Sequence, residues 1–344
     1  MNKIRETVSA AAVGLAFLMP LSAQAQTVLN YSHFGPDRGF EAEVLKQFTA
    51  DVKEATGGEI DIRVTYGGAL LSVPESARGV GARVADMATI VMPFTPAETV
   101  NYRVVDLPIN PTDPWVAVKA ANELVATNDI VRGEFDKMNL THLGNFATTE
   151  IVFICNKEVS DIDDLKGAKF RIQPPTSTQF GEFGVVSVSV SVPEVYQALD
   201  RGFVVCAQTY LTAVLPFRHY EVAKNILEVH QGEAMSYGVF INKGVFEGLS
   251  EANRAALAAA GQAASENYAR LALEEIKRAR QVLTEEHGVT FHQLAADDQA
   301  TLDAARSITV DAFKQNANES VLADFLALSE KYQKELEANG YPWN

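Results

Sequence analysis

The sequence predicts an α/β protein of two domains with a mainly helical C-terminal part. Three observations lead to this prediction. The chain has 344 residues, whereas one domain usually takes about 150. Strand-like and helix-like segments alternate in residues 26–145 and again in 146–245, a pattern typical of sheets covered by helices. Residues 246–344 carry apolar side chains mainly at helical spacing.

The first 25 residues have the pattern of a secretory signal peptide. Lys3 and Arg5 precede an apolar stretch at 11–19, which an Ala-Gln-Ala triplet at 23–25 follows. The apolar stretch is shorter than the roughly 20 residues that span a bilayer. We therefore predict cleavage after residue 25, a periplasmic location, and a mature chain that does not span the membrane. The alternative is an uncleaved N-terminal membrane anchor.

Residues 26–145 are predicted to form mainly the first domain. A strand at 28–34 is followed by a helix at 40–55, a strand at 60–64, a short helix after Pro74 and a strand at 85–92. This β-α-β-α-β order predicts a parallel sheet with helices on its faces.

Residues 146–245 are predicted to form mainly a second α/β domain. The strand-like and helix-like runs of the middle of the chain are strands at 140–146, 151–155, 168–173, 186–192 and 203–207, and helices at 115–135 and 193–199. Valine and serine alternate strictly at 186–192, which would place the valines on one face of a strand.

Residues 246–344 are predicted to be helical and to return across both domains. One or two helices fill 249–286, with Tyr268 in the apolar stripe, and helices at 296–317 and 321–338 follow. The sequence contains no linker that separates the domains, so we expect the chain to cross between them more than once.

Composition excludes several classes of function. Hydrophobic residues make up 47% and charged residues 21%, as in an ordered globular protein. The 29 basic and 44 acidic residues give a net charge of −15, which disfavours nucleic-acid binding. Six histidines and two cysteines leave little material for a metal site, and the sequence has no HExxH, CxxC, GxSxG or Walker A motif. We predict no enzyme activity, no metal and no cofactor.

The two cysteines, Cys155 and Cys206, each lie in a strand-like run. An oxidising periplasm permits a disulfide between them. Two buried free thiols are the alternative, because the sequence does not give the distance between the two Cα atoms.

Arg171 is the ligand-binding candidate that the residue pattern singles out. It lies at the end of a short strand, just before Pro174 and Pro175. Ligands bind at strand ends in open α/β sheets, and a buried guanidinium needs an anionic partner. That partner could be a ligand carboxylate or an acid of the protein such as Glu194.

An ordered set of segments resembles the solute-binding proteins of TRAP (tripartite ATP-independent periplasmic) transporters. The segments cover nearly the whole mature chain and lie at 56–71, 81–88, 161–206, 220–227 and 241–257. The resemblance implies a clamshell periplasmic-binding-protein fold, with crossing strands, a long helix spanning both domains and a ligand cleft closed by hinge bending. It also implies a periplasmic receptor that delivers a small organic acid to ion-gradient-driven TRAP permease subunits.

The resemblance also suggests site residues. Arg171 matches the family's carboxylate-binding arginine, and the cysteine pair resembles that of one subgroup, which favours a disulfide. The other expected ligand-contacting residues are His33, Phe34, Glu75, Ile151, Gln173, Val192, Thr209, Tyr210 and Tyr237.

Departures from the family pattern bear on the identity of the ligand. Ile151 stands where sialic-acid receptors have a second arginine, and Val192 and Thr209 also differ from the usual residues. These changes disfavour sialic acid and favour a monocarboxylate with an apolar or aromatic body. The alternative functions are a receptor for an ABC importer or a sensor kinase, and a periplasmic enzyme acting on an organic acid.

Overall fold

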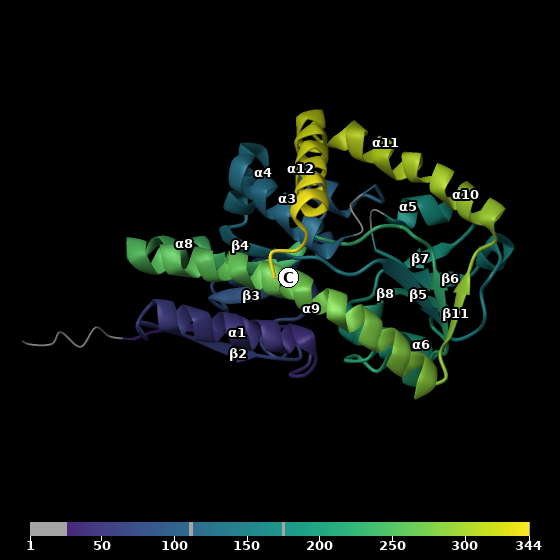
Figure 1. Ribbon diagram of the computed structural model, residues 1–344, viewed down its shortest axis with the longest axis horizontal. Coiled ribbons are helices and arrows are strands. Elements are labelled where there is room, and N and C mark those ends of the chain that lie inside the picture. The colour runs from purple at the N-terminus through teal and green to yellow at the C-terminus, as the bar shows by residue number, and fades with distance from the viewer. Residues whose placement is uncertain (1–25, 110–112, 174–175, 344) are drawn as a thin grey trace, which may run out of the picture.

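The computed structural model describes residues 26–109, 113–173 and 176–343. The expected signal peptide, Pro174 and Pro175 lie outside these residues. The described chain has two β-sheets, and each sheet with its helices is called a lobe here (Figure 1).

Lobe 1 contains a five-stranded sheet of order β2-β1-β3-β10-β4. Strand β1 pairs in parallel with β2 and β3, which confirms the parallel sheet expected from the first half of the sequence. Strand β10 comes much later in the chain and is inserted antiparallel between β3 and β4. The strands are β1 (Thr27–Ser32), β2 (Ile60–Thr65), β3 (Met87–Val91), β4 (Leu140–Phe146) and β10 (Tyr237–Asn242).

Two helices of lobe 1 begin at residues whose side chains cap them. The Asp113 side chain accepts hydrogen bonds from two backbone N–H groups at the start of α3, and Asn128 does the same for α4. Helix α1 buries Val44, Leu45 and Phe48 in the core that it shares with β2 and α9. The helices are α1 (Phe40–Ala55), α2 (Ser76–Gly81), α3 (Pro114–Thr127) and α4 (Asp129–Lys137), with 3-10 turns η1 (Val73–Glu75), η2 (Met92–Phe94) and η3 (Tyr102–Asp106).

Lobe 2 contains a six-stranded sheet of order β11-β9-β5-β8-β6-β7. Its strands are β5 (Ile151–Cys155), β6 (Lys169–Arg171), β7 (Val186–Val188), β8 (Cys206–Tyr210), β9 (Asn225–Glu228) and β11 (Thr290–Gln293). Its helices are α5 (Thr176–Gly181), α6 (Val195–Asp200) and α7 (Leu211–Val214), with 3-10 turns η4 (Ile162–Leu165), η5 (Val192–Glu194) and η6 (His219–Glu221).

A disulfide joins the two central strands of lobe 2. Cys155 on β5 lies directly opposite Cys206 on β8, and their Cα atoms are 4.0 Å apart. This confirms the pairing that the family resemblance favoured over two free thiols.

Three strand predictions in lobe 2 were wrong in extent, and the strand expected at 168–173 is only the three residues of β6. The predicted strand at 203–207 begins only at Cys206, because the N–H groups of Phe203 and Val204 still bond to the Ala198 carbonyl at the end of α6. Phe203 is therefore 51% exposed rather than buried. The alternating run at 186–192 forms a strand only at its first three residues, on the sheet edge, where Val186 is 46% exposed.

Two chain segments cross together between the lobes. One runs from β4 to β5 and the other from β9 to β10, and they are hydrogen-bonded to each other. The Thr148 N–H donates to the Ala234 carbonyl at 2.9 Å, and the Ile151 N–H donates to the Gly232 carbonyl at 2.8 Å. We call these residues, 147–150 and 229–236, the crossing segments.

A third connection is the single helix α9 (Glu251–Glu285), which spans 35 residues. Its first half packs in the core of lobe 1 and its second half, through Ala279 and Leu283, in the core of lobe 2 (Figure 1). The helix lies very close to β4. A Cβ atom added at Gly144 would come within 2.2 Å of the Gly261 carbonyl oxygen, so glycine is required there.

The C-terminal part contacts both lobes. Its elements are α8 (Lys243–Glu247), α10 (Ala296–Ala304), α11 (Arg306–Asn316) and α12 (Glu319–Asn339), in addition to α9 and the unexpected strand β11. Helix α12 packs on α3 of lobe 1, whereas β11 extends the sheet of lobe 2 by pairing with β9.

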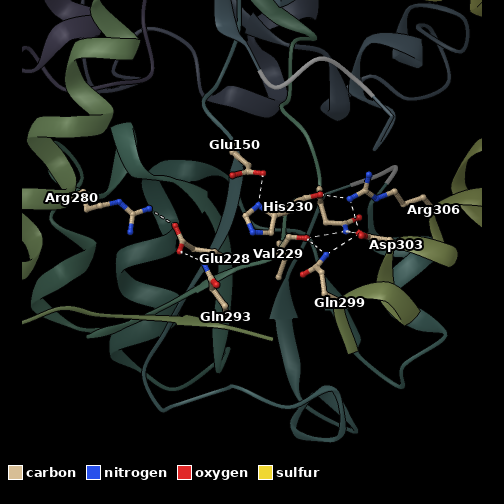
Figure 2. Close-up of polar contacts among 10 residues, drawn as sticks. Glu150, Glu228, Val229, His230, Arg280, Gln293, Gln299, Asp303 and Arg306 are labelled. Atoms are coloured by element: carbon tan, nitrogen blue, oxygen red, sulfur yellow. Dashed lines mark hydrogen bonds and ion pairs between the residues drawn. The ribbon is translucent and has the colours of Figure 1, made fainter. Parts of the chain in front are cut away.

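Polar contacts attach this C-terminal part to the end of β9 (Figure 2). Arg280 of α9 forms an ion pair with Glu228, to which Gln293 of β11 also donates a hydrogen bond. Gln299 of α10 donates to the Val229 carbonyl at 2.9 Å. The start of one crossing segment is thereby held against lobe 2. Within the described ranges, no helix is both long and apolar enough to cross a bilayer.

Candidate ligand-binding cleft

A cavity, partly open to solvent, lies between the lobes at the crossing segments. Both lobes, both crossing segments and α9 contribute to its wall. From lobe 1 and α9 come Phe34, Pro36, Arg38, Gly39, Phe40, Glu41, Val91, Pro93, Tyr237 and Tyr268. The crossing segments contribute Thr148, Ala234 and Ser236, and lobe 2 contributes Gln173, Val192, Tyr210, Thr212, Ala213, Pro216 and Phe217.

Arg171 is fully buried on the lobe 2 side of this cavity, at the end of β6. Its Nε donates to the Val190 carbonyl and its Nη1 to the Gln208 carbonyl, both at 2.8 Å. The remaining nitrogen, Nη2, has no hydrogen-bond partner within the described chain. Burial lowers the pKa of Arg171 to about 10, so the group is still a cation at neutral pH. The two carbonyls fix the plane of the guanidinium and leave one end of it unpaired.

No acid of the described chain forms an ion pair with Arg171. Glu194 is instead the acid of a capping box, where it accepts hydrogen bonds from the N–H and the hydroxyl of Ser191. The alternative that Glu194 neutralises Arg171 is therefore wrong.

Other unpaired polar groups lie near Arg171. The side-chain nitrogen of Gln173 and both ring nitrogens of His219 are buried without partners in the described residues. Burial and the charge of Arg171 lower the pKa of His219 to about 3, so this imidazole is neutral. Burial raises the pKa of Tyr210 to about 12, and the nearby Arg171 acts in the opposite direction. Gln173 and Tyr210 line the cavity, whereas Arg171 itself does not.

The lobe 1 side of the cavity carries a carboxylate, Glu41, in the first turn of α1. The hydroxyls of Tyr237 and Tyr268 lie 3.2 Å and 3.3 Å from its Oε1, and they are also within hydrogen-bond distance of each other. Because each phenol carries one proton, two of these three contacts can be hydrogen bonds at a time when Glu41 is ionised. Burial raises the pKa of Glu41 to about 7, although these hydrogen bonds act in the opposite direction.

The structure distributes the expected site residues over three environments. Phe34, Gln173, Val192, Tyr210 and Tyr237 line the cavity. Arg171, His33, Ile151 and Thr209 are buried and do not line it, and Glu75 is exposed on the surface.

The residues that do not line the cavity have other contacts. His33 lies against Gly35 and shares a hydrogen bond of 2.9 Å with the Thr89 hydroxyl. Ile151 is opposite Tyr210 in the register of β5 and β8. Glu75 accepts a hydrogen bond of 2.6 Å from the Ser72 hydroxyl. Ligand contact by these residues stays a prediction.

Several polar residues of the wall were not expected from the sequence, and two of them, Glu41 and Tyr268, contact each other. Glu41 is one of two acids in the first turn of α1, and nothing in the sequence distinguishes it from the exposed Glu43. Tyr268 was assigned only to the apolar stripe of its helix. A helical projection of α9 cannot show that its hydroxyl meets a carboxylate from another helix.

Comparison with known proteins shows the same architecture in solute receptors. The C4-dicarboxylate-binding periplasmic protein DctP of Rhodobacter capsulatus is 25% identical over 328 residues, which cover 92% of this chain and 95% of the relative. The crystal structure of DctP7, a Bordetella pertussis extracytoplasmic solute receptor binding pyroglutamic acid, has a TM-score of 0.78 and 22% identity, covering 88% of this chain and 99% of that one. A TRAP solute-binding protein from Rhodoferax ferrireducens T118, solved with copurified benzoate, has a TM-score of 0.79 and 19% identity, covering 90% and 99%.

These two structures show the two-domain periplasmic-binding-protein fold that the sequence analysis expected. A match to a whole family covers residues 31–316, most of the chain and most of both lobes. It agrees with the ordered segments by which the sequence resembles TRAP receptors. The chain belongs to the bacterial extracellular solute-binding proteins of family 7.

Proposed function

We propose that this protein is a periplasmic receptor that binds a small organic acid through Arg171 and delivers it to an ion-gradient-driven TRAP permease. The observation that carries the proposal is the unpaired Nη2 of a fully buried guanidinium. A buried charge is costly without a counter-ion, and no acid of the described chain supplies one. A ligand carboxylate would supply both the charge and the missing hydrogen bond.

The surroundings of Arg171 suit this role. Because two backbone carbonyls already hold the guanidinium, little entropy would be lost when a ligand binds. The unpaired amide nitrogen of Gln173 offers a second donor for the same carboxylate. Arg171 is buried and does not line the cavity, so side chains over it would have to move before a ligand carboxylate could reach it.

The rest of the wall favours a ligand with an apolar or planar body. Phe34, Val192 and Phe217 line the cavity and present mainly carbon atoms. The ligands of two structural neighbours, pyroglutamic acid and benzoate, are small monocarboxylic acids of this kind. We therefore favour a monocarboxylate over a C4-dicarboxylate.

Contacts across the mouth of the cleft fit a receptor that closes on its ligand. Arg38 of lobe 1 donates two hydrogen bonds, of 3.0 and 2.7 Å, to the carbonyl of Pro216 in lobe 2. The lobes also connect through the two crossing segments, α9 and the C-terminal helices, and the crossing segments with α9 would act as the hinge. A closed cleft would shield the ion pair from water and would present a surface to the permease.

Thermal-shift screening of organic acids, followed by calorimetry, tests the proposal. A bound acid at a hundred times its Kd should add about 2.7 kcal/mol to the free energy of unfolding. Arg171→Ala should abolish the shift, whereas Arg201→Ala, at an exposed arginine of lobe 2, should not. Unchanged affinity in a folded Arg171→Ala protein would refute the role of the guanidinium. Native mass spectrometry of the purified protein should reveal any copurified acid.

A further inference from the structure

Glu41 is an unusual residue to find in the wall of a cavity proposed to take acids. Its side chain is 19% exposed and lines the cavity. Within 4.0 Å of its carboxylate, the described residues supply no lysine or arginine. Among the described residues, the basic side-chain nitrogen within 4.0 Å of it is His33 Nε2, 3.9 Å from Oε2. Burial lowers the pKa of His33 to about 3, so this contact is not an ion pair.

The hydrogen bonds of Glu41 are all on one of its two oxygens. Tyr237 and Tyr268 both lie within hydrogen-bond distance of Oε1, and either phenol can donate to it. No donor bonds to Oε2 in the described part of the chain, although an ionised carboxylate offers about four acceptor positions. The phenols therefore orient the carboxylate and leave Oε2 as an unused acceptor at the cavity wall.

A role in helix capping does not account for this arrangement. An acid in the first turn stabilises a helix through its dipole, and Glu43 occupies the same turn of α1. Glu43 is solvent-exposed, however, where the same benefit carries no desolvation cost. Glu41 instead faces the cleft at the cost of burial, and it is held there by tyrosines from two other elements, β10 and α9.

We propose that Glu41, held by Tyr237 and Tyr268, is a second ligand subsite that accepts a hydrogen bond from an O–H or N–H group of the bound acid. This inference rests on the proposed function, in which Arg171 on the opposite lobe takes the ligand carboxylate. The ligand class is then a monocarboxylic acid that also carries a hydroxyl, lactam or other N–H donor. A second carboxylate placed against Glu41 would be repelled, so C4-dicarboxylates are selected against.

Matched pairs of acids test the subsite. One pair is pyroglutamate and 5-oxotetrahydrofuran-2-carboxylate, in which a ring oxygen replaces the lactam N–H. The other is 3-hydroxybenzoate and benzoate, and succinate represents the dicarboxylates. For at least one pair, calorimetry should show that the wild-type protein binds the donor-bearing acid about ten- to a hundredfold more tightly than its partner. Succinate should bind more weakly than either donor-bearing acid.

Glu41→Gln is the sharpest variant. The phenols need an acceptor, so they would bond to the amide oxygen and turn the amide nitrogen towards the ligand. The amide N–H of the variant would then face the O–H or N–H group of the ligand, so the preference for the donor-bearing acid should disappear or reverse. Glu43→Gln, in the same helical turn, should keep the wild-type ratio. Tyr268→Phe removes one of the two phenols that hold Glu41 and should reduce the ratio by a smaller factor.

The outcomes separate this inference from the proposed function. If acids bind and depend on Arg171, but Glu41→Gln keeps the wild-type ratio, the subsite is refuted and the receptor function stands. If succinate binds the wild-type protein best, the subsite is refuted as well. If no acid binds, or binding survives Arg171→Ala, the proposed function falls and the subsite falls with it.

Discussion

The lobe 2 wall of the cleft holds its charged group with backbone carbonyls, whereas the lobe 1 wall holds its charged group with side-chain hydroxyls. Arg171 is bonded by the carbonyls of Val190 and Gln208, and Glu41 by the phenols of two tyrosines. Arg171 is fully buried and Glu41 only partly, and burial shifts their pKa values in opposite directions: it lowers the pKa of the arginine and raises that of the glutamate.

The difference teaches which part of the site can vary. Backbone carbonyl groups are present whatever the side chains are, so the hydrogen bonds that hold Arg171 depend on the path of the backbone in lobe 2. The hydrogen bonds that hold Glu41 depend on the side chains of Tyr237 and Tyr268, and a single substitution is enough to remove one of these phenols. We infer that lobe 2 supplies the general affinity for a carboxylate and that lobe 1 supplies the selection among acids.

The largest effect that we expect is the loss of stability when the disulfide of lobe 2 is removed. The Cys155–Cys206 disulfide closes a loop with a sequence separation of 51, and Arg171 lies within that loop. A loop of this length corresponds to about 4 kcal/mol of stability by chain entropy. A Cys155→Ala/Cys206→Ala protein should lose about this amount in urea unfolding. Wild-type protein under reducing conditions is the control, since it keeps both sulfur atoms. A loss below about 1 kcal/mol in both would show that lobe 2 does not depend on the cross-link.

The next effect compares the two charges directly through substitutions that keep them. Arg171→Lys retains a cation but loses the planar fork that the two carbonyls and a ligand would share, so acid affinity should fall about a hundredfold. Glu41→Asp retains an anion but withdraws it from the phenols. Glu41→Asp should lower the affinity about tenfold, and only for acids that carry a hydrogen-bond donor.

Calorimetry on both variants, with a donor-bearing acid and its donor-free partner, compares the two losses of affinity. If a folded Arg171→Lys protein binds acids within about threefold of the wild-type affinity, lobe 2 contributes a positive charge alone and not the planar hydrogen-bonding geometry of arginine. A Glu41→Asp protein that weakens every acid equally would mean that Glu41 supports the cleft as a whole and does not select among ligands.

The same contrast explains how much could be predicted from the sequence. Helix α1 and strands β4 and β5 have the residue bounds expected from the sequence, because α1 buries one regular face and the two strands are short, mostly buried runs. The start of β8 was misplaced because Phe203 and Val204 are apolar but still belong to the end of a helix. Strand β11 was missed because its four residues are exposed or half-buried.

The site residues were likewise only partly predictable from the sequence. Arg171 stood out because it is a charged residue on a short strand that ends at two prolines. Glu41 did not stand out, because acids are common in the first turn of a helix. Its position depends on Tyr237, some two hundred residues away in the sequence, and on Tyr268. This contact depends on how α1, β10 and α9 pack together, so no local sequence pattern predicts it.

The smallest effect that we expect is a pH dependence that belongs to the Glu41 wall alone. The pKa of Glu41 is raised to about 7, that of His33 is lowered to about 3, and that of Arg171 is about 10. Burial raises the pKa values of Tyr237 and Tyr268 well above the ordinary tyrosine range. Of these five groups, Glu41 alone changes its charge between pH 6 and 8. Below pH 7 the neutral acid predominates and is a weaker acceptor, so affinity for a donor-bearing acid should fall about tenfold from pH 8 to pH 6. Affinity for its donor-free partner should change little.

Stability of the ligand-free protein should change in the opposite sense. A raised carboxyl pKa means that the folded state binds more protons than the unfolded state between the ordinary value of 4.5 and about 7. The stabilisation is fully present below that window and is lost as the pH rises through it, by at most about 3 kcal/mol. Glu41→Gln should remove both dependences, and Glu43→Gln should keep both. If the pH dependence of affinity persists in Glu41→Gln, the titrating group lies elsewhere, and the two walls do not divide affinity and selection as we infer.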